Sequence, residues 1–117
     1  MPLFVDARVP VRFGSVSDAN AGSALLIEGD APAPDGVAVA RFTAGVPAGP
    51  HPPGCPCCAT RSPAAVALAA LFLARARGEV VFFRTLVAVC PTAEGEAAVR
   101  AAAEFDPLVL AWFRVIS

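Results

Sequence analysis

The chain contains no lysine and no tyrosine among its 117 residues, and all nine basic side chains are arginine. The missing lysine excludes the phosphate-binding loop G-x-x-x-x-G-K-[ST], whose lysine reaches the β- and γ-phosphates of a nucleotide. Charged residues make up only 16% and the formal net charge is −1, so no excess of positive charge favours nucleic acid or an acidic membrane. We therefore expect no nucleotide, nucleic-acid or membrane partner, and no nucleotide-hydrolysing enzyme.

Secretory and membrane-spanning signals are also missing. The N-terminal stretch MPLFVDARVPVRFG lacks the charged start and long apolar run of a secretory signal. The longest apolar segment, residues 64–74, is closed by Arg75 and Arg77 and is too short to cross a bilayer. We expect a soluble, cytoplasmic protein with reduced thiols, in which a dense cysteine cluster more often indicates metal or redox chemistry than a disulfide.

Hydrophobic patterns and end signals predict strands alternating with helices. A helix over 63–77 begins at a Ser62 cap and ends at Gly78, and the apolar run 79–89 is typical of a strand buried on both faces. The other expected elements are extended segments at 3–6, 9–13, 23–29 and 37–42, a helix capped by Thr92, a short helix after Asp106-Pro107, and a strand beginning in 114–117. The pattern predicts a single α/β domain, residues 1–117, with a small parallel or mixed sheet and flanking helices.

Three of the four cysteines lie within four positions, in the stretch Gly54-Cys55-Pro56-Cys57-Cys58. Thiolates are the ligands that soft metals prefer, and Zn²⁺ usually takes four ligands in a tetrahedron. Geometry disfavours a disulfide between neighbours such as Cys57 and Cys58. The spacing therefore predicts a metal site, for zinc, made by the three clustered cysteines. The candidates for a fourth ligand are Cys90, which we favour, and His51, Glu28 or water.

Two other functions fit the same residues. A thiol redox protein would use Cys57 or Cys58 as the nucleophile, although Cys58 lies four residues before the Ser62 cap and not at the helix start that would lower its pKa. A pure interaction module would dock through its Pro-rich segment and its sheet edge. The nearly all-round apolar helix 63–77 needs cover on several sides, which predicts self-association or a protein partner.

The cysteine stretch resembles a known signature. GCPCCATRSPAAVALAALFLARA (54–76) is similar to the Gly-Cys-x-Cys-Cys motif, polar turn and helix of the CobW-like metallochaperone GTPases, relatives of the urease and hydrogenase nickel-insertion GTPases. FFRTLVAVCPTAEGEAAVRAAAEFDPLVLAWFRV (82–115) resembles the strand, loop and helices that follow, and SALLIEGD (23–30) a strand that ends in an acid. The resemblance covers roughly residues 23–117.

This resemblance implies a truncated P-loop GTPase-like fold and a role in delivering zinc or another transition metal. In that family the motif cysteines and an acid from the second strand form the metal site, which here implies Cys55, Cys57 and Cys58 with Glu28 or Asp30. The departure is the missing lysine, and GSVSDANAGS (14–23) also lacks the spacing of a phosphate-binding loop. We expect a shortened, nucleotide-free relative that acts as a metal carrier or accessory subunit.

Overall fold

The computed structural model describes residues 7–44 and 62–116. Within them, five strands form one sheet in the order β3-β2-β4-β1-β5, and every neighbouring pair is parallel. The strands are β1 (Val9–Phe13), β2 (Ser23–Glu28), β3 (Val39–Phe42), β4 (Thr85–Val89) and β5 (Phe113–Val115). The α/β prediction is confirmed, and of its two sheet types the parallel one is present.

The central strand of the sheet is β4, and its three middle residues are buried. It pairs with β2 on one side and with β1 on the other, so that Ala88 lies between Leu26 and Phe13 in register. Leu86, Val87 and Ala88 of the sequence TLVAV are all buried. A strand covered on both faces needs apolar side chains at successive positions and not at alternate ones. The segment TLVAV has this pattern.

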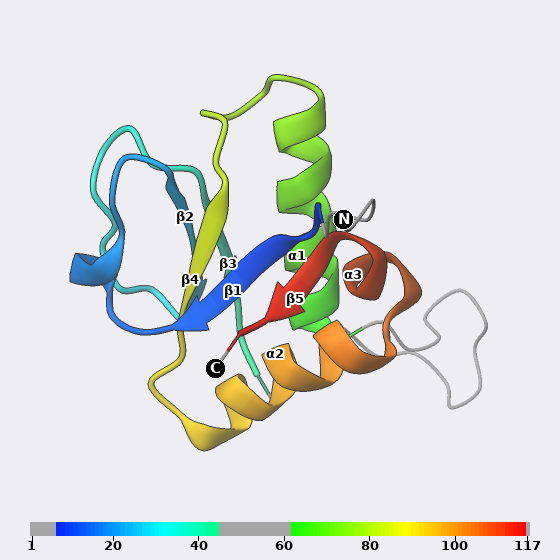
Figure 1. Ribbon diagram of the computed structural model, residues 1–117. Helices are drawn as coiled ribbons and strands as arrows, with labels where there is room; N and C mark the ends of the chain where they lie inside the picture. Colours follow the sequence, from blue (N-terminus) through cyan, green and yellow to red (C-terminus); the bar gives the residue numbers. More distant parts are fainter. Residues whose placement is uncertain (1–6, 45–61, 117) are drawn as a thin grey trace, which may run out of the picture.

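Three helices cover one face of the sheet (Figure 1). They are α1 (Pro63–Ala76), α2 (Ala93–Phe105) and α3 (Pro107–Trp112). The fully buried side chains on this side come from the helices and from the sheet: Leu68 lies on α1, Val99 on α2 and Phe113 on β5. The main core therefore lies between the sheet and this single helical layer.

The opposite face of the sheet is covered by loops. Leu25, Ile27 and Val87 form a small second core there, packed against Val16 of the short 3₁₀ helix η1 (Val16–Asp18) and against Val37. All-parallel sheets usually carry helices on both faces. Here the connection from β1 to β2 is a nine-residue loop with one 3₁₀ turn, so this face has a thinner cover.

The helix ends follow the sequence expectations. The Ser62 side chain accepts a hydrogen bond from the Ala65 N–H, and Thr92 accepts one from the Gly95 N–H. Gly78 follows α1 with φ of +72°, a left-handed conformation that glycine adopts without steric cost. Asp106 caps α3 by accepting from the Leu108 and Val109 N–H groups. The caps place each helix end where the sequence predicts it.

The prediction of one continuous strand over 79–89 is wrong in its first half. The strand begins at Thr85, and Val81 and Phe82 are 56% and 57% exposed. Gly22, which immediately precedes β2, accepts hydrogen bonds from the Arg84 and Thr85 N–H groups. Residues 79–84 therefore extend past the start of the neighbouring strand and have no ladder partner there.

An arginine holds this extended segment instead. The Arg75 guanidinium lies 4.6 Å from the ring centroid of Phe82 and 5.2 Å from that of Phe83, and it donates a 2.8 Å hydrogen bond to the Phe83 carbonyl. Cation–π contacts and a charged hydrogen bond together fix the chain between α1 and β4. Burial lowers the pKa of Arg75, with the neighbouring charge of Arg84 as a smaller cause.

Replacing Asp106 by alanine is expected to lower the free energy of unfolding by about 1–2 kcal/mol, because two N–H groups at the start of α3 lose their acceptor. Urea denaturation followed by circular dichroism measures this change. Glu104→Ala, at an exposed position of α2, is the matched control and should change stability little. Equal stability of Asp106→Ala and the wild type would contradict the role of this cap.

Candidate functional site

Two residues that the sequence offered as alternatives for the fourth metal ligand lie beside each other at the carboxyl edge of the sheet. Glu28 ends β2, and Cys90 directly follows β4. The two strands are neighbours, with Ile27 opposite Val89. Glu28 and Cys90 are therefore the next pair in register, on the face that the helices cover. The strand order, which brings β2 and β4 together, creates this pair.

The Glu28 carboxylate is anchored to the start of α2. Its two oxygens accept hydrogen bonds from the Thr92 N–H at 3.3 Å and from the Thr92 hydroxyl at 2.6 Å. It also lies against Gly95, where an added Cβ would overlap the carboxylate. A negative charge is favourable at a helix N-terminus. Glu28 therefore joins the end of β2 to the loop that carries Cys90.

The Cys90 thiol is half-buried and packs at the border of the main core. Burial, and to a smaller extent the charges of Glu28 and Glu96, raise its pKa to about 11. The thiol is therefore protonated at neutral pH in the metal-free protein. A divalent cation beside it would offset the two carboxylate charges and favour the thiolate, because opposite charges stabilise the ionised form.

The other predicted ligands, Cys55, Cys57, Cys58 and His51, lie outside the described residues. In the described ranges 7–44 and 62–116, no three His, Cys, Asp or Glu side chains gather into a group that could hold a metal. The structure thus brings together Cys90 and Glu28. It adds Thr92 and Gly95, whose roles at this site sequence reasoning missed. For Gly95, the available signal was a glycine inside the first turn of a helix.

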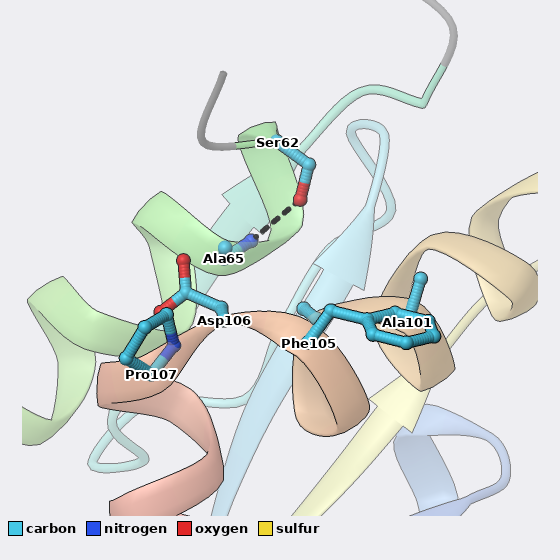
Figure 2. A pocket seen from close by; sticks show the side chains of 7 residues that line it. Ser62, Ala65, Ala101, Phe105, Asp106 and Pro107 are labelled. Carbon is cyan, nitrogen blue, oxygen red and sulfur yellow. Dashed lines mark hydrogen bonds between the residues drawn. The ribbon is translucent and has the colours of Figure 1, made fainter. Parts of the chain in front are cut away.

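The start of α1 lies at the same edge of the sheet. The helix connects the end of β3 to the start of the parallel strand β4, so it runs back along the sheet from the carboxyl edge. A pocket of about 340 Å³ lies there, between the start of α1, the end of α2 and Pro107. Figure 2 shows Ser62 and Ala65 of α1 on one side of it and Ala101 and Phe105 of α2 on the other.

Comparisons with known proteins add no assignment. No protein-family model, no curated protein and no solved structure matches this chain. The likeness to the CobW-like proteins therefore stays a prediction based on the cysteine motif. Among the described helices, none is both long and apolar enough to span a membrane.

Replacing Gly95 by alanine is expected to lower the free energy of unfolding by about 1–3 kcal/mol, because the new Cβ overlaps the Glu28 carboxylate. In a Glu28→Ala background the same replacement should be neutral or stabilising, since alanine favours a helix over glycine by about 1 kcal/mol. A double-mutant cycle by urea denaturation measures the coupling. Equal effects of Gly95→Ala in both backgrounds would rule out this contact.

The reactivity of Cys90 tests its electrostatic surroundings. In a chain with Cys55→Ser, Cys57→Ser and Cys58→Ser, Cys90 is the one remaining thiol. Its rate of alkylation by iodoacetamide should rise with pH through a pKa near 11. Glu28→Gln should lower that pKa, because it removes a negative charge that disfavours the thiolate.

Glu104→Gln, which changes a carboxylate at the other end of α2, is the control for that comparison. It should leave the titration of Cys90 where it is. An alkylation profile with an ordinary cysteine pKa, about 8.5, would show that burial and the two carboxylates do not act on this thiol as described.

Proposed function

We propose that this protein binds a transition-metal ion, zinc above all, through Cys55, Cys57, Cys58 and Cys90, without nucleotide hydrolysis. The observation that carries the proposal is the position of Cys90: it lies at the carboxyl edge of the sheet, where α1, the helix that follows the cysteine motif, also begins. Ligand sites of open parallel sheets collect at this edge. Three thiols close in sequence and a fourth at that edge supply the four soft ligands of a structural zinc site.

The length of chain between the motif and α1 is compatible with this site. Gly95 contacts Glu28, and Ala102 lines the pocket at the start of α1. Seven residues of α2 separate these two points, which corresponds to roughly 10 Å along the helix axis. The four residues from Cys58 to Ser62 reach at most about 14 Å when extended. These two lengths are of the same order, which supports the proposal that Cys58 and Cys90 contribute to one site.

Glu28 has a positioning role in this proposal. Both of its oxygens already accept hydrogen bonds from Thr92, so it orients the loop that carries Cys90. Together with Glu96 it supplies a negative potential around the thiol. That potential opposes a bare thiolate and attracts a divalent cation, which favours metal binding at Cys90 over use of this thiol as a redox nucleophile.

The absence of lysine separates this chain from a GTP-dependent metallochaperone. A protein that keeps the thiolate ligands and lacks the lysine of the phosphate-binding loop can bind and release a metal, but it has no group to couple that cycle to nucleotide hydrolysis. We therefore place it as a zinc carrier or accessory subunit of the CobW-like type. Its cysteines would act in a reducing compartment such as the cytoplasm.

The metal proposal predicts one equivalent of Zn²⁺ per chain and a melting temperature that rises with added zinc, because the metal binds the folded chain. Cys57→Ser and Cys90→Ser should each weaken binding by about a hundredfold or more in a competition titration with a chromophoric chelator. This estimate exceeds the roughly 10–100-fold typical of residues outside the ligand shell. Glu28→Gln should weaken it less, as expected for a positioning residue.

Glu104→Gln is the control variant and should bind zinc like the wild type. Loss of binding in Cys57→Ser but not in Cys90→Ser would remove Cys90 from the site. Absence of zinc from protein purified without chelator, combined with a disulfide that forms reversibly among the motif cysteines, would overturn the metal proposal in favour of thiol redox chemistry.

A further inference from the structure

A second cavity lies on the face of the sheet that loops cover. It has a volume of about 360 Å³. It is separate from the cysteine site, because its walls come from the first residues of β2 and β4, from β1, and from the loop between β1 and β2. The lining residues used below are Arg12, Asp18, Asn20, Val87, Pro10 and Ile116. The metal proposal uses none of them.

The floor of this cavity is held by a closed set of hydrogen bonds. The Ser23 hydroxyl lies 3.1 Å from the Thr85 hydroxyl and 3.1 Å from Asn20 Oδ1, and it accepts from the Asn20 N–H. Asn20 Oδ1 also accepts from the Gly22 N–H at 3.0 Å. These contacts tie the loop to the starts of β2 and β4. The cavity is therefore formed by fixed groups before any ligand arrives, which limits the loss of conformational freedom on binding.

Two opposite charges line the same cavity. The Arg12 guanidinium, on β1, makes no hydrogen bond and no ion pair with residues 7–44 or 62–116. Asp18 is held by the Ser15 N–H at 2.7 Å, and this bond, the Ser15 hydroxyl and the charge of Arg12 lower its pKa. The carboxylate is thus ionised and near the guanidinium, but the two groups do not pair directly. Each keeps hydrogen-bonding capacity for a ligand.

The remaining wall is apolar. Pro10 and Val87 lie on the strand surfaces, and Ile116, which is 40% exposed, stands at the rim after β5. Cavities that bind small molecules combine such apolar walls with a few fixed polar groups. A purely anionic ligand at Arg12 would be repelled by Asp18, and a purely cationic ligand at Asp18 would be repelled by Arg12.

We propose that this cavity binds a free aliphatic α-amino acid as its zwitterion. Arg12 pairs with the ligand carboxylate, Asp18 accepts from its ammonium group, and the aliphatic side chain packs on Pro10, Val87 and Ile116. A zwitterion is the small-molecule class that satisfies both charges at once without leaving either one beside a like charge. The proposal does not depend on the metal site, so either can fail alone.

The test uses L-leucine as the probe with the full chain, followed by backbone amide chemical-shift changes. Binding should shift amides of β1 and of residues 18–23. 4-Methylpentanoate, which lacks the ammonium group, and 3-methylbutylamine, which lacks the carboxylate, should each bind at least about tenfold more weakly, since each leaves one charge unpaired. Failure of leucine, isoleucine and valine to bind at about 10 mM would overturn the proposal.

Two substitutions separate the roles of the charges. Arg12→Gln should weaken leucine binding at least about tenfold, and Asp18→Asn should do the same while leaving 4-methylpentanoate binding equal or stronger. Arg77→Gln, at the exposed end of α1, is the control and should bind leucine normally. Equal binding of leucine and 4-methylpentanoate to the wild type, or unaltered leucine binding by a folded Arg12→Gln variant, would exclude the zwitterion.

Discussion

The parallel pairing of β4 with β2 and β1 is the constraint on which the rest of the structure depends. A strand inserted between two neighbours satisfies its backbone groups on both sides and must be apolar on both faces, as Leu86, Val87 and Ala88 are. The insertion also determines which strand ends meet. Glu28 and Cys90 become neighbours only because β4 lies beside β2, although 62 positions separate them in the chain.

The two faces of this sheet have different covers, and the difference divides the molecule chemically. On one face three helices build the main core and carry the Glu28–Thr92 contact at its border. On the other face a loop replaces a helix. A loop leaves room between itself and the strands, which its polar side chains line, whereas a helix would fill that space with apolar ones. The thin cover is therefore the physical origin of the charged cavity beside Arg12 and Asp18.

The surroundings of Cys90 disfavour its thiolate in a way that the proposed metal ion would reverse. Burial and two carboxylates all disfavour the thiolate in the free protein. A divalent cation beside the thiol would reverse this effect, because the same carboxylates would stabilise the positive ion that the thiolate binds. Glu28 contributes to this field from a fixed position, because Thr92 holds both of its oxygens. Its influence on Cys90 therefore needs no direct bond to a metal.

The sequence by itself determined the local elements. Ser62 and Thr92 begin α1 and α2 as their cap signals predict, and α3 begins after Asp106 as expected. The strands β1 and β4 lie within segments that the sequence predicts to be extended. It also supplied the cysteine motif, whose role stays a prediction. Only the tertiary structure decided that 79–84 is not strand, that Glu28 meets Cys90, and that one face lacks helices. These features depend on strand order and on where a neighbouring strand begins. Contacts between distant segments determine both, and local propensity and periodicity do not encode them.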